Sequence, residues 1–162
     1  MTTVRRAGVL DAEVLGRLLW DFNTEFDTET DDADVLAVRF ARLLDLPEIV
    51  AVLAEGDSGE PVGFALVSLR PAIWFDGPVA QLEELYVVPA LRSHGIGTEV
   101  LDVCRSLARE QGSPEMHIGV DEVDVDTRRF YERHGFVNIE EGVDYRMLYY
   151  VGPTAPAASS GA

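Results

Sequence analysis

Two periodicities of hydrophobic residues organise the chain. Apolar side chains spaced three and four residues apart are typical of amphipathic helices. They predict helices beginning near Asp11, near Val35 and at Ile96, and a short fourth helix at residues 126–134 that Gly135 closes. Alternating or uninterrupted apolar runs rich in Val, Leu and Tyr are typical of strands. They predict strands at residues 2–7, 49–54, 62–69, 81–88, 116–120, 136–139 and 145–151.

The order of these elements indicates the fold class. It predicts an α/β (α+β) protein with a mixed sheet and helices on the faces of that sheet. With 162 residues the chain is long enough to bury a core, and we expect a single domain over residues 1–151. Residues 152–162 have too few apolar side chains to bury, so we expect a disordered tail there.

Charge narrows the classes of partner. The sequence has 29 acidic and 13 basic residues, which gives a net charge of −16 at pH 7. Such a surface repels nucleic acids and anionic membranes, so neither is expected as a partner, whereas a cationic substrate would be attracted. Heavy acidity also serves solubility, and by itself it selects no substrate.

Other features bear on the compartment and on metals. No apolar run approaches the length of a membrane span, and we expect no secretory signal at the N-terminus. A single cysteine, Cys104, argues against an internal disulfide framework and suits the cytoplasmic location that we expect. It lies on the apolar stripe of the third predicted helix, so its thiol should be buried and unreactive. The three histidines lack the spacing of a zinc site, and no metal is expected.

The turn between strand 81–88 and the next helix has the composition of an anion-binding loop. Glycines let the backbone bend sharply and bring its N–H groups close to a ligand, and the helix dipole and an arginine favour a phosphate. A pyrophosphate is the expected ligand, although the same glycines would also serve a tight turn alone. The spacing lacks the lysine of a P-loop and is shorter than a dinucleotide-binding fingerprint. The loop consists of Arg92, Ser93, His94, Gly95, Ile96, Gly97 and Thr98.

Two motifs in this order resemble those of one family. Arg92-x-x-Gly95-x-Gly97, preceded by LEELYVVP, resembles the acetyl-CoA pyrophosphate loop of the GNAT superfamily of N-acetyltransferases. Downstream, FYERHGF at residues 130–136 resembles the helix of that family that ends in Tyr, three residues and Gly-Phe. The resemblance extends over roughly residues 4–151 and implies a GNAT-like, mostly antiparallel central sheet flanked by helices.

The resemblance also implies how a cofactor would be held. Acetyl-CoA would be the acyl donor, with its pyrophosphate on the loop from Ser93 to Thr98. Its pantetheine arm would pair with the backbone of Leu85, Tyr86 and Val87.

Glu83 and Glu84 are the leading carboxylates for removing a proton from the acceptor amine. Residues 82–87, LEELYV, resemble the corresponding strand of polyamine and diamine acetyltransferases. That likeness implies Glu83 as the water-mediated general base and Glu84 as the residue that holds the cationic nitrogen of the substrate. Strict alternation puts the two on opposite faces, so they share a role only if a bulge rotates one of them. The structural alternative is solvent exposure or pairing with an arginine, and His117 is a further candidate base.

Tyr131 is the candidate general acid. The family motif places such a tyrosine near the CoA sulfur, and a phenol with the ordinary pKa of about 10 can donate its proton to a departing thiolate. The alternative is a core aromatic residue with its hydroxyl at the surface. Asp124 and Thr127 stand where the family usually has Asn and Ala, which leaves a cofactor contact of Asp124 open.

These features predict an acetyl-CoA-dependent N-acetyltransferase that moves an acetyl group directly to a primary amine of a small cationic acceptor. The resemblance assigns acceptor specificity to two connectors, residues 23–34, dense in carboxylates, and residues 70–78, which contain Trp74 and Phe75. Acidic and aromatic groups together suit a cationic amine. The rival predictions are acetylation of a protein or peptide and a non-catalytic acyl-CoA-binding sensor. A homodimer is common among similar proteins.

Overall fold

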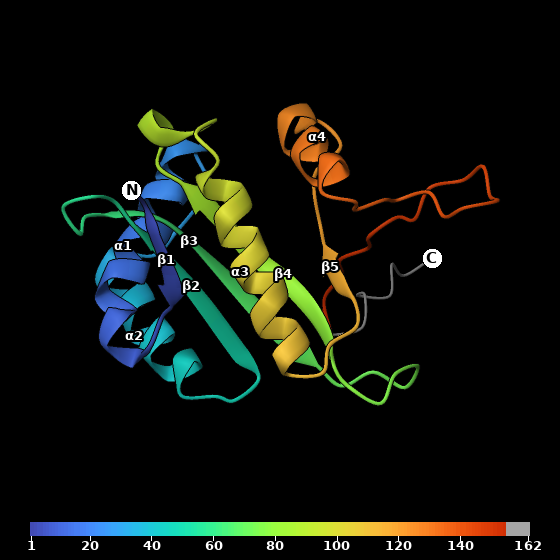
Figure 1. Ribbon diagram of the computed structural model, residues 1–162, viewed down its shortest axis with the longest axis horizontal. Coiled ribbons are helices and arrows are strands. Elements are labelled where there is room, and N and C mark those ends of the chain that lie inside the picture. The colour runs from blue at the N-terminus through green and yellow to red at the C-terminus, as the bar shows by residue number, and fades with distance from the viewer. Residues whose placement is uncertain (155–162) are drawn as a thin grey trace, which may run out of the picture. The chain divides into compact units, whose positions relative to one another are not determined.

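The computed structural model describes residues 1–154, and the contacts divide the chain into two compact units, Met1–Ile118 and a second that begins at Gly119. The described sheet lies wholly in the first unit (Figure 1). In chain order, the elements are β1 (Thr3–Arg6), a 3-10 turn (Val9–Asp11), α1 (Ala12–Glu25), α2 (Ala33–Leu44), β2 (Ile49–Glu55), β3 (Pro61–Arg70), β4 (Val79–Val87), a second 3-10 turn (Pro89–Leu91), α3 (Ile96–Glu110), β5 (Met116–Ile118) and α4 (Val125–Arg133).

The sheet has five strands in the order β1-β2-β3-β4-β5. Pairing is antiparallel from β1 to β4 and parallel between β4 and β5, because α3 carries the chain back along the sheet between these two strands. The predicted mixed, mostly antiparallel sheet with flanking helices is confirmed. Strands β2 and β3 are buried along nearly their whole length, which explains their uninterrupted apolar sequence.

Helices α1 and α2 cover one face of this sheet. Leu15 and Leu18 of α1 and Phe40 of α2 form one buried cluster with Phe64 of β3 and Tyr86 of β4. The predicted amphipathic stripes therefore exist and face the strands. The first helix continues to Glu25, so it includes the first residues of the acidic connector.

Helix α3 covers the other face and crosses the strands in Figure 1. Its fully buried side chains, Val100, Leu101 and Cys104, recur at helical spacing. Burial raises the pKa of the Cys104 thiol to about 12. The predicted burial of this cysteine is confirmed.

The second unit contains α4 and differs from the prediction after it. The two final strands predicted at residues 136–139 and 145–151 are wrong, since neither segment is a strand in the described structure. One backbone hydrogen bond joins them, from the Met147 N–H to the Asn138 carbonyl (2.6 Å). Side chains such as Tyr149 and Val151 are 79% and 87% exposed. Apolar and β-branched residues favour strands only where a ladder and a buried face are available, and residues 1–154 provide neither for these segments. Most of the predicted tail lies outside the described residues.

Candidate active site

The two candidate glutamates lie at an irregularity in the pairing of β4 with β3. Leu66 pairs with Glu84, whereas the next residue of β3, Val67, pairs with Leu82. Glu83 is therefore an extra residue in β4, the defining feature of a β-bulge. Bulges interrupt the strict alternation of side chains, so the opposite faces expected for a regular strand do not apply here.

The bulge brings both carboxylates to the face that α1 and α2 cover. Glu84 lies opposite Leu66, whose side chain belongs to the cluster beneath α1. Glu83 accepts a hydrogen bond from the Ser68 hydroxyl. Ser68 follows Leu66 by two residues and so shares its face. The two carboxylates are therefore neighbours on one face, which the sequence allowed only if a bulge rotated one of them.

Their environments nevertheless differ. Burial, and secondly the neighbouring charge of Glu83, raise the pKa of Glu84 to about 7. Glu83 is exposed to solvent. A carboxylate whose pKa lies close to neutral can accept a proton and release it again at physiological pH, which a general base must do. The arrangement thus provides one carboxylate suited to proton transfer and a second, solvent-exposed carboxylate beside it.

Beyond the bulge, β4 keeps a strand partner on only one side. Strand β3 pairs with β4 as far as Val87, but β5 pairs only with Ala80, Gln81 and Leu82. Within residues 1–154, the β5-facing edge of residues 83–87 thus has no strand partner. Backbone groups on such an edge can pair with an extended, amide-containing ligand.

The predicted phosphate loop lies at the carboxyl end of β4. Gly95 is the N-cap of α3 and has φ of 88°, and Ser93 also has a positive φ, 64°. Glycine adopts this left-handed region freely, whereas serine is strained in it. The sharp turn directs the first-turn N–H groups of α3, which begin at Ile96, out of the helix end, and such groups bind anions. His94 closes the loop through its Nδ1, 2.7 Å from the Arg92 carbonyl oxygen.

Arg92 has protein partners that the sequence did not reveal. Its Nη1 and Nη2 donate to the two carboxylate oxygens of Glu25, at 2.6 and 2.7 Å, and its Nε donates to the Val87 carbonyl at 2.9 Å. Sequence reasoning counted Glu25 only among the acidic residues of the first connector. No spacing rule could have paired two residues that are 67 positions apart.

A row of polar residues continues from the glutamates along the same face. Ser68, Gln81 and His117 are successive cross-strand partners in β3, β4 and β5. The His117 Nε2 lies 2.6 Å from a Glu115 carboxylate oxygen, and its Nδ1 lies 3.3 Å from the Arg70 Nη2. His117, the alternative base, thus belongs to a hydrogen-bonded group with Glu115 and Arg70.

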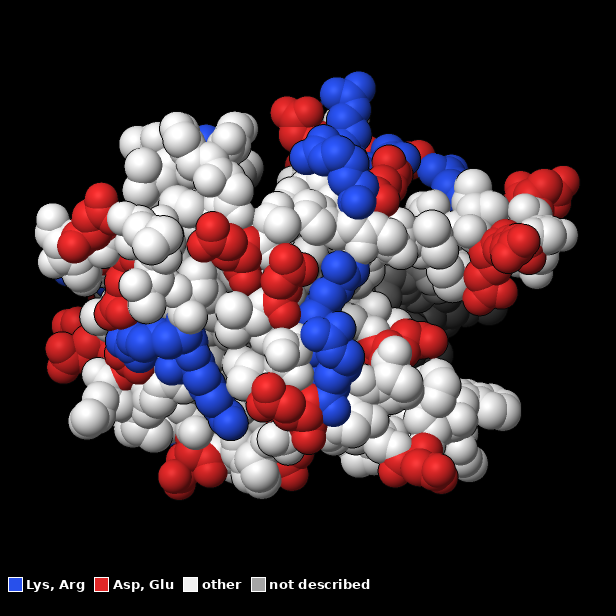
Figure 2. All heavy atoms as spheres, in the orientation of Figure 1, with Lys and Arg blue, Asp and Glu red and all other residues white. Residues whose placement is uncertain are grey.

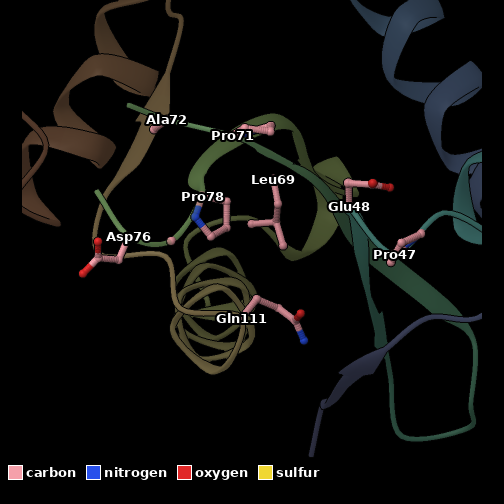
Figure 3. A pocket seen from close by; sticks show the side chains of 9 residues that line it. Pro47, Glu48, Leu69, Pro71, Ala72, Asp76, Pro78 and Gln111 are labelled. Carbon is pink, nitrogen blue, oxygen red and sulfur yellow. The ribbon is translucent and has the colours of Figure 1, made fainter. Parts of the chain in front are cut away.

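Two pockets flank the connector between β3 and β4. One, of about 400 Å³, is bounded by Trp74 and Phe75 of the connector and by Glu115 and His117 of the β5 region. The other, of about 360 Å³, is shown in Figure 3, where Gln111 approaches it from the carboxyl end of α3. Helix α3 has 15 residues and is about 22 Å long, so this second pocket lies far from the phosphate loop at the other helix end.

Tyr131 belongs to the second unit and is buried there. The Gly135 N–H donates to the Glu132 carbonyl and the Phe136 N–H to the Tyr131 carbonyl, both at 3.1 Å. Gly135 has φ of 83°, and the rings of Tyr131 and Phe136 are 5.4 Å apart. These are the two hydrogen bonds and the apolar contact of a Schellman motif, so the Tyr-x-x-x-Gly-Phe pattern has a helix-ending role of its own. Asp124 is the N-cap of α4.

Among the residues that the structure describes, no group of three or more His, Cys, Asp or Glu side chains could hold a metal ion. None of the described helices combines the length and the apolar character that a membrane crossing requires.

Comparison with known proteins identifies the class to which this fold and site belong. The model of the Acetyltransferase (GNAT) family matches residues 13–136. The chain therefore belongs to the GNAT acetyltransferase family, and the family predicted from the two sequence motifs is confirmed. GNAT acetyltransferases use acetyl-CoA as the acyl donor.

Individual relatives support this assignment. The crystal structure of a "putative acetyltransferase" from Arthrobacter sp. FB24 is 43% identical, with a TM-score of 0.85 over 93% of this chain and 95% of that one. Aminoglycoside N(6')-acetyltransferase type 1 of Klebsiella aerogenes is 34% identical over 99 residues, which are 60% of this chain and 62% of that protein. AAC(6')-Iy, solved with the bisubstrate analogue CoA-S-monomethyl-acetylneamine, is 20% identical with a TM-score of 0.73 over 92% of this chain and 99% of that one, and it shows a shared fold.

Proposed function

We propose that this protein is an acetyl-CoA-dependent N-acetyltransferase that transfers the acetyl group directly to a primary amine of a small cationic acceptor, with Glu84 as general base. One observation carries the proposal. Glu84 is a half-buried carboxylate with a pKa raised to about 7, next to the open edge of β4. This assignment exchanges the roles that the likeness to polyamine acetyltransferases implied for Glu83 and Glu84.

The donor fits the residues that are present. The first-turn N–H groups of α3 suit a diphosphate, and the free edge of β4 at Leu85, Tyr86 and Val87 suits the amides of pantetheine. A thioester held along this edge would run past the bulge. Binding would thus bring the acyl carbon close to Glu84.

Proton transfer then follows from the side chains. The acceptor arrives as an ammonium, and Glu84 removes one proton, directly or through a water molecule. The free amine attacks the thioester carbon, the new N–C bond forms, the C–S bond breaks, and the nitrogen gives up its second proton to solvent. The family motif makes Tyr131 the candidate that donates a proton to the departing thiolate and regains one from solvent. Cys104 is the only cysteine of the sequence, and its burial and high pKa argue against a covalent acyl-enzyme on sulfur.

The surroundings of the bulge favour a cationic acceptor. Glu83, exposed and hydrogen-bonded to Ser68, can hold an ammonium beside Glu84, and the polar row leads to a pocket with Trp74 and Glu115. Figure 2 shows the face that α3 covers, where acidic side chains are spread among arginines; the bulge lies on the other face. The relatives named as aminoglycoside acetyltransferases support the same class of acceptor.

A thiol-release assay tests the proposal. Purified protein is supplied with acetyl-CoA and a panel of polyamines, aminoglycosides, amino acids and peptides, and CoA formation is measured. We expect turnover with at least one small polyamine or aminoglycoside, and its loss in Glu84→Gln with CoA affinity intact. Turnover only with peptides would support the rival protein acetyltransferase. Tight CoA binding without turnover, unaffected by Tyr131→Phe, would support the sensor. The predicted homodimer remains a prediction that light scattering can test.

A further inference from the structure

We propose that Arg92 contributes to cofactor binding as a positioning residue, acting through Glu25, and that it is not a ligand of the diphosphate. The proposal rests on the function proposed for the loop that begins at Arg92. It changes the role of one residue that the motif would count among the phosphate contacts.

The guanidinium of Arg92 is held on three sides. It forms a bidentate ion pair with Glu25, the last residue of α1, and its Nε donates to the Val87 carbonyl at the end of β4. Its central carbon lies 5.6 Å from the ring centre of Tyr86 and 5.9 Å from that of Phe26. Two ion-pair bonds, one backbone bond and two aromatic rings define one position for this side chain.

That position is on the α1 side of the sheet. The Tyr86 ring stacks on Phe22 of α1, with ring centres 5.1 Å apart and planes inclined by 25°. Because Arg92 lies over the Tyr86 ring, its guanidinium reaches toward α1. Helix α3, whose first-turn N–H groups suit the diphosphate, covers the opposite face. The Arg92 side chain and the helix that carries the anion-binding N–H groups thus lie on different faces of the sheet.

The ion pair also removes the charge that would attract a phosphate. The Glu25 carboxylate lies 2.6 Å from the Arg92 guanidinium, and the hydrogen bonds to Glu25 are the largest reason why the pKa of Arg92 is raised. The pair carries no net charge, so its attraction for a diphosphate is small. Three of the five guanidinium N–H groups are already used.

The Arg92–Glu25 ion pair fixes the position of the residue at which the loop begins. Ser93, the next residue, has φ of 64°, a conformation that a non-glycine residue keeps only when its surroundings impose it. Arg92 is fixed to β4 and α1 before Ser93, and α3 begins at Ile96 after it. The backbone N–H groups between these two anchors are thereby held where a diphosphate can meet them.

A double-mutant cycle separates the two roles. CoA affinity is measured by calorimetry for wild type, Glu25→Gln, Arg92→Gln and the double variant. If Arg92 positions the loop, each single variant binds CoA about tenfold more weakly, and the double variant is no weaker than either. If Arg92 is a diphosphate ligand, Glu25→Gln frees a charge and leaves affinity unchanged or tighter, while Arg92→Gln weakens it. That second result would overturn the proposal. Arg39→Gln breaks a comparable pair with Asp31 and serves as the matched control.

A measurement without cofactor keeps this proposal distinct from the proposed function. Amide hydrogen exchange of the free protein should be faster in the segment 93–98 in Glu25→Gln and Arg92→Gln, and unchanged in Arg39→Gln. Ser93→Gly in the Glu25→Gln background should restore part of the CoA affinity, because glycine needs no support at positive φ. Unchanged exchange in all variants would contradict the positioning role. Failure of wild type to bind CoA would instead refute the function proposed for the loop.

Discussion

The two halves of β4 follow each other directly in the sequence but differ in their strand partners. From Ala80 to Leu82 the strand pairs with both β3 and β5, and two of these three residues are buried. From Glu83 to Val87 it has β3 alone within the described residues, and it begins with a bulge.

This difference shows where the strand can take part in chemistry. In the first half every backbone group can be satisfied by a neighbouring strand, and the side chains contribute to the core. In the second half the free edge can accept a ligand backbone, and the bulge turns two carboxylates to one side. We therefore propose that the boundary between stability and catalysis falls between Leu82 and Glu83, and the following predictions test that boundary.

The largest expected effect is on turnover. Glu84→Gln removes the group whose pKa is poised near neutral, and we expect kcat to fall by about 10²- to 10⁴-fold, the usual contribution of a general base. CoA affinity should not change, because the free edge and the loop remain. Steady-state kinetics and calorimetry on the same preparation provide the check. Wild-type kcat in Glu84→Gln would exclude this residue as the base.

The next effect is on stability. Leu82 is 1% exposed in the paired half, and Leu82→Ala should lower the free energy of unfolding by about 3 kcal/mol. We expect kcat within about threefold of wild type at a temperature where the variant is folded. Urea denaturation measures the loss, and Leu10→Ala, at a fully exposed position, is the control. A large fall in kcat without a loss of stability would mean that the half of β4 with two strand partners takes part in the chemistry, which would contradict the proposed boundary.

A smaller effect concerns the pH dependence of stability. The pKa of Glu84 is raised to about 7 from its ordinary value of 4.5, so the folded state binds more protons than the unfolded state between these values. Wild-type stability should therefore fall, relative to Glu84→Gln, as pH rises from about 4.5 to 7. Allowing for partial solvent screening, we expect about 1–2 kcal/mol. Parallel denaturation curves across this range test it, and a constant difference would mean that Glu84 has an ordinary pKa.

The smallest effect comes from Glu83. Its charge contributes to the raised pKa of Glu84, so Glu83→Gln should move the acidic limb of the kcat/KM profile to lower pH. We expect a loss of less than about tenfold in kcat at pH 8. Ser68→Ala, which removes the hydrogen-bond partner of Glu83, should change both the acidic limb and kcat less than Glu83→Gln does. A greater loss in Glu83→Gln than in Glu84→Gln would reverse the assigned roles.

Much of the framework was predictable from local patterns. The amphipathic stripe of α3 and the burial of Cys104 follow from helical spacing, and the glycine turn before α3 follows from composition. The helix end at Gly135 was also predictable from local sequence, because the left-handed conformation at this position favours glycine, which has no Cβ. The final strands failed because strand formation depends on a partner, which no short segment contains.

The site depended on contacts across the chain. Local patterns were enough to place two adjacent glutamates on a strand, before a glycine turn and a helix. Contacts between distant segments make Glu83 the inserted residue of a bulge, desolvate Glu84 and pair Arg92 with Glu25. The reason is physical: the periodicity of one segment reports the shape of that segment, whereas pairing register, desolvation and ion pairing depend on which distant residues the fold brings beside it.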